Sequence, residues 1–382
     1  MKTVLSCICA WLMLQCSLSA QEIIAKKEFP DTRWLQKSIP LEDGFVVMGH
    51  RHRSERKGNT IENYYVPYLS KLDFDMQVVW EQSFVESVHI NFRTVEEGKD
   101  AFYLMGNSYD PGSPKAKAQL IKVSKSGKVL FKKEYAYPNH HTVEGKHLMV
   151  MPNGDLIAIA RVYRNYNSYG SPWLIRLTDQ GEIIWDKVLR QHYQIAPRGL
   201  KLCDNGNVLI YGGTYHERED MQAENIAAWA FEFNPEAPDD IKFNKVIRDH
   251  KDYSFSDVMQ LESGGWWTIG RARVPADRIS DLKDYTVLTE FDSNWNQLRQ
   301  KKIEHEKAMV PHSFCWNEAE SQLEIAGHFN RHPRWKGIHI SMTADWVEVE
   351  RRVGEDGISR QIFAYSDGTL MKLHKNQLQI LR

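Results

Sequence analysis

Residues 151–162 read MPNGDLIAIARV, an Asn-Gly turn followed by an apolar strand that carries a small residue, Ala160, near its end. Residues 203–214, CDNGNVLIYGGT, repeat the arrangement with Gly212 in the matching place. Versions of this turn recur at Asp43-Gly44, Asp100, Asn153-Gly154, Asn205-Gly206, Gly264-Gly265, Ser321 and Asp367-Gly368. The chain therefore holds about seven copies of one unit, spaced by roughly 46 to 58 residues.

A small residue follows the turn at a fixed interval in six units, and only the last unit differs. The positions are Gly49, Gly106, Ala160, Gly212, Gly270, Gly327 and, in the last unit, Leu373. Each unit is too short to bury its own apolar faces, so neighbouring units must stack. The pattern predicts an all-β, seven-bladed β-propeller.

Each unit divides into four predicted strands, A to D, with apolar alternation between turn residues. In the third unit we expect these strands at residues 143–151, 155–162, 173–177 and 182–188. The C strands of the other complete units are expected at residues 68–72, 120–123, 229–233, 287–291 and 338–342. The four-stranded scheme predicts antiparallel blades.

The last unit ends one strand short, and the sequence near the N-terminus supplies a spare one. Residues 22–27, EIIAKK, match the D-strand pattern of residues 182–187, EIIWDK. We expect this strand to complete the seventh blade and close the ring, which removes open sheet edges.

The tract at residues 173–187, WLIRLTDQGEIIWDK, has echoes at residues 69–81 and 120–132. It resembles the secreted bacterial β-propeller repeats of the quinoprotein-like (PQQ-like) class over nearly the whole mature chain. The resemblance implies the fold but no single activity, because such repeats serve scaffolds, binding proteins and enzymes. Trp80 and Trp185 match the tryptophan at the end of the quinoprotein motif, but the equivalent positions in two other units are Phe131 and Phe243. We therefore expect no quinone cofactor and interpret these aromatic residues as packing between blades.

The first 20 residues have the layout of a cleaved export signal. Met1-Lys2 precedes an apolar run from Val4 to Leu14 and a small-residue stretch that ends at Ala20. The apolar run is too short for a membrane span, which needs about 20 residues. We expect a signal peptide at residues 1–20, a single propeller domain at residues 21–382, and a periplasmic or extracellular location.

Charge and cysteine content narrow the classes of partner. Lys and Arg number 49 and Asp and Glu 50, and both signs are mixed along the chain, so we expect no nucleic-acid partner. Beyond the signal, only Cys203 and Cys315 remain, in units that are not neighbours, and we expect two free thiols. We expect a monomer.

The B-to-C and D-to-A loops emerge on one face of such a ring, and they carry most of the chemically versatile side chains. About twelve of the 15 histidines map there. The ligand-binding candidates from B strands and B-to-C loops are His50, His52, Arg53, Arg161, Arg164, Tyr166, His216, Arg271, Arg331 and Trp335. The D-to-A side adds His140, His141, His192, Tyr193, Arg198 and His312. Arg pairs bidentately with carboxylates and sulfates. We therefore expect this face to bind an anionic polysaccharide or a segment of an envelope protein.

An enzyme hypothesis uses the second group of residues. In a polysaccharide lyase, a His or Tyr removes the proton next to a uronate carboxylate that an Arg neutralises. No sialidase box, Gly-x-Ser-x-Gly, phosphate loop, His-Glu-x-x-His or Cys-x-x-Cys motif is present. His140, His141 and His192 could meet at the channel mouth, but adjacent histidines on a strand point apart, so we expect no metal site.

Overall fold

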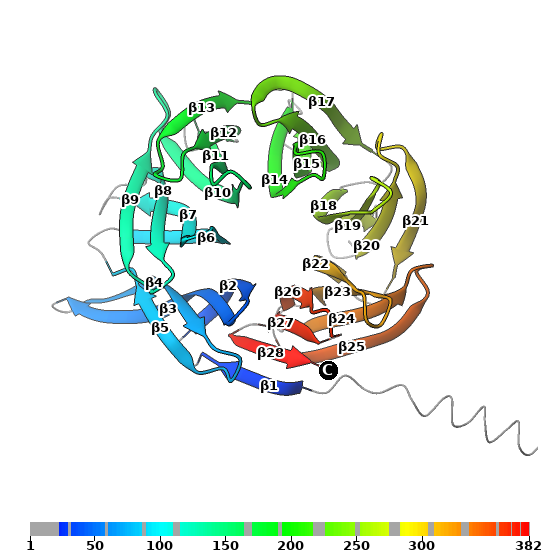
Figure 1. Cartoon of the computed structure of the whole chain (residues 1–382), viewed down its shortest axis with the longest axis horizontal. Helices are drawn as coiled ribbons and strands as arrows, with labels where there is room; N and C mark the ends of the chain where they lie inside the picture. Colours follow the sequence, from blue (N-terminus) through cyan, green and yellow to red (C-terminus); the bar gives the residue numbers. More distant parts are fainter. Residues whose placement is uncertain are drawn as a thin grey trace, which may run out of the picture.

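The computed structural model is a ring of seven four-stranded antiparallel sheets, which confirms the predicted seven-bladed propeller (Figure 1). The structure describes residues 23–29, 32–57, 60–85, 89–109, 115–163, 170–189, 193–216, 226–248, 253–274, 283–304, 309–329, 336–356, 359–367, 369–374 and 376–381. The predicted signal peptide lies outside these residues. Among them, no helix is long and apolar enough to cross a membrane.

Each blade runs outward from an inner strand, and its strands follow chain order. Blade one comprises β2 (Thr32–Leu41), β3 (Gly44–Lys57), β4 (Thr60–Leu72) and β5 (Val78–Ser83). Blade two comprises β6 (His89–Glu97), β7 (Ala101–Tyr109), β8 (Ala116–Ser124) and β9 (Val129–Tyr135). Blade three comprises β10 (Thr142–Val150), β11 (Leu156–Tyr163), β12 (Ser171–Leu177) and β13 (Ile183–Val188). Blade four comprises β14 (Tyr193–Leu202), β15 (Val208–His216), β16 (Ile226–Asn234) and β17 (Ala237–Ile247).

The remaining blades repeat this order, except that the last one borrows a strand. Blade five comprises β18 (Ser254–Gln260), β19 (Trp266–Val274), β20 (Lys283–Phe291) and β21 (Gln297–Ile303). Blade six comprises β22 (Met309–Asn317), β23 (Gln322–Phe329), β24 (Lys336–Thr343) and β25 (Glu348–Asp356). Blade seven comprises β26 (Ser359–Ala364), β27 (Leu370–His374), β28 (Gln377–Leu381) and β1 (Ile23–Glu28).

The N-terminal strand closes the ring, as predicted. Strand β1 pairs antiparallel with β28, from Ile23 opposite Leu381 to Glu28 opposite Gln377. The first and last described strands therefore share one blade, and β1 covers an edge that β28 would otherwise expose.

The apolar core lies between neighbouring blades. Ile159 and Leu174 of blade three pack in one cluster with Ile210 and Trp229 of blade four. The outer-strand aromatic residues bridge blades as predicted. The Trp80 ring lies 6.1 Å from that of Phe102 in the next blade. Trp185 does the same with Phe233, also at 6.1 Å. Burial of such side chains contributes about 1.5–3 kcal/mol each, so the interfaces between blades stabilise the ring.

Every inner strand contains a β-bulge at the equivalent position. The strand register shifts by one residue in each A strand, which leaves one residue without a partner on the second strand. The seven bulge residues are Gln36, Arg93, Lys146, Arg198, Ser256, His312 and Arg360. Bulges bend a strand and redirect a side chain, so the ring presents seven redirected side chains at one level.

The small residue of the sequence repeat lies opposite the bulge. In blade two, Gly106 pairs with the residue before Arg93, and an added Cβ would lie 2.2 Å from the Asn91 carbonyl oxygen. At Gly212 the added Cβ would lie 2.3 Å from the Ala196 carbonyl oxygen. In these blades a small side chain is required because the backbone of the bulged strand crosses directly over it, whereas in blade one the Tyr68 side chain occupies the space beside Gly49.

Blade seven satisfies the same constraint in another way. The register places His374, not Leu373 as the sequence count indicated, opposite the residue before the bulge. That residue is Ser359, whose Oγ lies 3.0 Å from His374 Nδ1. Here the small side chain is on the inner strand, which makes room for a large one on the second strand.

Two neighbouring glycines provide a matched test of this constraint. Gly212→Ala should destabilise the protein by about 1–3 kcal/mol, because the new methyl group would meet backbone atoms that cannot move independently. Gly213→Ala should cost less than about 1 kcal/mol, because its nearest neighbours are side-chain atoms at 3.0 and 3.1 Å. Urea unfolding measures both, and equal losses would contradict the proposed role of the bulge.

Candidate functional site

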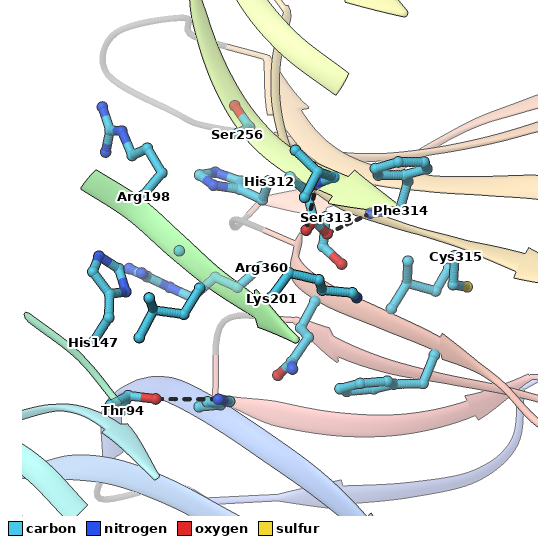
Figure 2. Close-up of a pocket in the computed structure, with 18 of the residues that line it drawn as sticks. Thr94, His147, Arg198, Lys201, Ser256, His312, Ser313, Phe314, Cys315 and Arg360 are labelled. Carbon is cyan, nitrogen blue, oxygen red and sulfur yellow. Dashed lines mark hydrogen bonds between the residues drawn. The ribbon is translucent and has the colours of Figure 1, made fainter. Parts of the chain in front are cut away.

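The inner strands of all seven blades surround a central cavity of about 630 Å³. Figure 2 shows His147, Arg198, His312 and Arg360 projecting into it from four different inner strands. Six of the seven bulge residues line the cavity. The exception is Lys146, which pairs with Glu144 (Nζ to Oε2, 2.5 Å). The bulges therefore determine most of the polar lining of the channel.

Three bulge residues are arginines that pair with no carboxylate among the described residues. Within the described part of the chain, no Asp or Glu oxygen lies within 4.0 Å of the guanidinium groups of Arg93, Arg198 or Arg360. Burial, together with the nearby Arg93, lowers the pKa of Arg360. By contrast Arg176, a buried residue of β12 outside the channel, binds Asp155 and Glu236, each at 2.7 Å. The channel thus gathers cationic groups that have no described carboxylate at salt-bridge distance, although Glu144 is close enough to attract Arg93.

The two acidic residues of the cavity already have partners. Glu96 is paired with Lys37. Asp257 accepts hydrogen bonds from the Tyr211 hydroxyl at 3.2 Å and from backbone amides, and burial raises its pKa. Neither carboxylate is therefore positioned to neutralise the bulge arginines, and the cavity favours anions.

A second ring of polar residues lies one position beyond the small residue of each second strand. Its members are His50, Asn107, Arg161, Arg271 and His328, with Gly213 in blade four. His50, Asn107 and His328 are buried. This ring adjoins the bulges on the face where the B-to-C and D-to-A connections emerge, so that face is lined by two tiers of polar groups.

His312 and His328 connect the two tiers in blade six. His312 Nε2 lies 2.7 Å from His328 Nδ1, and the rings stack with centroids 4.9 Å apart. Burial lowers the pKa of His312 to about 3, and the neighbouring His328, Arg360 and Arg198 act in the same direction. Burial, Arg271 and Arg360 lower the pKa of His328 to about 4. Both imidazoles are therefore neutral at neutral pH.

His50 is a buried polar side chain of this region, with 2% of its surface exposed. Its ring lies 5.7 Å from the Trp34 ring, and neither ring nitrogen has a hydrogen-bond partner among the described residues. Burial lowers its pKa to about 4, helped by Arg93 and Arg360 and weakly opposed by the nearby Asn91. It is therefore an uncharged histidine beside two cations.

Of the six residues predicted on the D-to-A side, the structure brings two into the cavity, Arg198 and His312. His140 and His141 precede β10 and do not line the cavity; His140 Nδ1 lies 2.8 Å from the Pro138 carbonyl oxygen. Tyr193 begins β14. His192 lies outside the described residues.

Within the described ranges, no three His, Cys, Asp or Glu side chains gather closely enough to hold a metal ion.

The B-to-C candidates occupy strands more than loops. His50, His52 and Arg53 lie in β3, which pairs with β4 out to Lys57 opposite Thr60, so the predicted loop is an extended hairpin. Arg271 lies in β19, His216 ends β15, and Arg161 in β11 donates to the Gly170 carbonyl oxygen at 3.4 Å. Arg164, Tyr166, Arg331 and Trp335 lie outside the described residues.

The sequence did not single out Arg93, Lys146 or Arg360. Their one signal in the sequence is a nearly constant spacing, because each bulge residue precedes the residue opposite the bulge by 13 to 15 positions. Strand alternation alone cannot reveal a bulge, because the extra residue breaks the period of two.

The predicted free thiols are confirmed, with Cys203 buried and Cys315 partly buried.

Comparison with known proteins supports the fold and does not identify a family. No family model and no curated protein matches the sequence. Two solved polysaccharide lyases are similar over 94% of this chain. They are a PL25 ulvan lyase (9% identity, 95% of its chain, TM-score 0.57) and Uly1 (10% identity, 99% of its chain, TM-score 0.56). YCF48 bound to D1 peptide is similar over 95% of both chains (10% identity, TM-score 0.53). At such low identity these likenesses show a shared β-propeller architecture.

The buried histidines predict a loss of stability in weak acid. An unfolded histidine has a pKa of about 6.5, so between that value and about 4 the unfolded chain binds the proton that folded His50 does not. The contribution of the buried neutral histidine to the free energy of unfolding is therefore fully present above pH 6.5, and it is lost as the pH falls toward 4. For His50 the loss at pH 5 is about 2 kcal/mol.

Urea unfolding of the wild type and of His50→Phe at about pH 7.5 and about pH 5 tests this expectation. The variant should retain its stability at the higher pH, because the ring replaces one that has no hydrogen bond among the described residues. It should lose about 2 kcal/mol less than the wild type on acidification. An identical loss in both proteins would contradict the burial of a neutral His50.

Proposed function

We propose that this propeller binds an anionic polysaccharide at the channel face defined by the bulges, without cleaving it. The proposal rests on one observation, the three bulge arginines Arg93, Arg198 and Arg360, which have no carboxylate partner among the described residues. Arg presents a planar fork of donors that fits a carboxylate or sulfate, so a ligand that carries such groups would supply the missing charge.

Aromatic side chains beside the arginines favour a sugar over an acidic protein segment. The rings of Trp34 and Tyr65 lie 5.2 Å apart on blade one, and His52 lies 5.8 Å from Tyr65. His52 is exposed, and the other two are partly exposed. Such a cluster offers apolar faces for pyranose rings next to His50 and the Arg93 and Arg360 pair. The likeness to ulvan lyases, whose names describe action on a polysaccharide, supports the same ligand class.

Export belongs to the proposal, because extended acidic glycans are encountered in the cell envelope or outside the cell. The layout of residues 1–20 supports it. Mass spectrometry of the protein purified from its source would test this point, with a mature N-terminus at Gln21 expected. A full-length protein in the cytoplasm would contradict it.

Binding should depend on the bulge arginines. Arg93→Gln and Arg360→Gln should each weaken the binding of alginate or dextran sulfate roughly ten- to a hundredfold, because each variant removes a charge-assisted contact worth about 1.5–3 kcal/mol. Uncharged dextran should not bind with comparable affinity. Isothermal titration at fixed ionic strength measures the change.

Arg351→Gln is the matched control, because Arg351 lies in the outer strand β25 and pairs with Glu348 at 2.5 Å. It should bind as the wild type does. An equal loss in the control would show that affinity follows net charge. If a polyglutamate peptide binds more tightly than the polysaccharides, the ligand class is wrong.

Uronate elimination is a second candidate, favoured by neutral His312 beside Arg198 and by the likeness to lyases. A catalytic base works best with a pKa near the operating pH, and His312, at about 3, is a weak base already engaged with His328. Binding without turnover is therefore the stronger conclusion. Ultraviolet absorbance of unsaturated products should stay flat with alginate and ulvan. A rise that His312→Gln abolishes would establish the lyase instead.

A further inference from the structure

A side pocket of about 320 Å³ opens between blades four, five and six. Three consecutive bulges contribute to its wall, through Arg198 of β14, Ser256 of β18 and His312 of β22. Figure 2 shows these three side chains grouped together on neighbouring inner strands. Because it shares these residues with the central cavity, the pocket is continuous with the proposed binding face.

The charged side chains in the described lining of this pocket are all arginines. They are Arg198, Arg271 and Arg273, and no acidic residue belongs to that part of the lining. The central cavity differs, because Glu96 and Asp257 are part of its wall. Asp257 follows Ser256 directly in the sequence, but its carboxylate is held by the Tyr211 hydroxyl and by the backbone amides of Val258 and Phe314. The side pocket therefore gathers its cationic side chains in about half the volume of the central cavity.

Neutral donors and a short apolar wall complete the pocket. Ser254 and Ser256 supply hydroxyl groups, which suit the oxygens of an anion as well as sugar hydroxyls. Val310 and Pro311 form an apolar side against which a sugar ring can pack. The volume suits a small charged group together with the ring that carries it, and it lies near the lower limit of ordinary ligand pockets, about 300 Å³.

We propose that this side pocket is a discrete subsite for one oxoanion of the ligand, a sulfate ester or a carboxylate, held by Arg198, Arg271 and Arg273. The inference rests on the proposed function in one respect, namely that the oxoanion belongs to the same polysaccharide. The subsite would fix one charged group of the ligand at blades four to six, and this contact would set the register of the polysaccharide on the propeller. The Arg93 and Arg360 pair in blades two and seven would then contact a different part of the ligand.

The test uses the full chain and two small probes, sodium sulfate and sodium acetate, in thermal unfolding at matched ionic strength. Sulfate also stabilises proteins generally by exclusion from their surface, so the informative quantity is the difference between wild type and variant. Arg271→Gln and Arg273→Gln should each weaken the apparent sulfate affinity about tenfold, because each removes one charge-assisted contact. Arg351→Gln, the control on the outer strand β25, should respond to sulfate as the wild type does.

The outcomes separate this inference from the proposed function. A sulfate response that survives Arg271→Gln and Arg273→Gln, or that Arg351→Gln also removes, overturns the subsite. A localised response with no binding of alginate or dextran sulfate overturns the proposed function and leaves an oxoanion site. A larger response to acetate than to sulfate assigns the subsite to a carboxylate. Arg271→Lys, which keeps the charge but loses the fork, gives a second measurement if Arg271→Gln does not fold, and it too should weaken sulfate binding.

Discussion

The close approach of a bulged inner strand to a small residue on its neighbour is the constraint on which the rest of the structure depends. At Gly106 and Gly212 the backbone of the inner strand lies where a Cβ would be. The bulge is what redirects Arg93, Arg198 and Arg360 into the channel. One local feature, repeated around the ring, therefore links the sequence repeat, the geometry of the blades and the composition of the candidate site.

Electrostatics distinguishes the channel from the rest of the propeller. Outside the channel, the buried Arg176 is neutralised within the protein by Asp155 and Glu236. In the channel, the acidic residues are paired with other groups while three arginines have no carboxylate partner among the described residues. Buried histidines do not add charge at neutral pH, because burial and the arginines lower their pKa values. The channel therefore attracts anions through its arginines, and this attraction persists across the neutral pH range because the histidines stay uncharged.

The sequence predicted the architecture well, because turn residues, strand alternation and a small residue recur in fixed order. The closing strand β1 could be predicted because its pattern matches the other outer strands. The site was predicted only in part. Arg198 and His312 were found as loop-side residues, but Arg93 and Arg360 were missed because a bulge breaks the alternation that assigns side chains to faces. Residues 50–53 were predicted to lie in a loop because a run of polar residues is typical of loops. In the structure these residues pair with β4 and extend the hairpin.

The central claim is that the bulge arginines form the anion-binding surface, and arginine-specific modification tests it most directly. Phenylglyoxal labelling with and without alginate or dextran sulfate, followed by mass spectrometry, reports the protection of each arginine separately. The account predicts that the polysaccharide protects Arg93, Arg198 and Arg360, while Arg351 on the outer strand β25 reacts equally in both samples. Protection confined to arginines outside the channel, with these three unchanged, would contradict it.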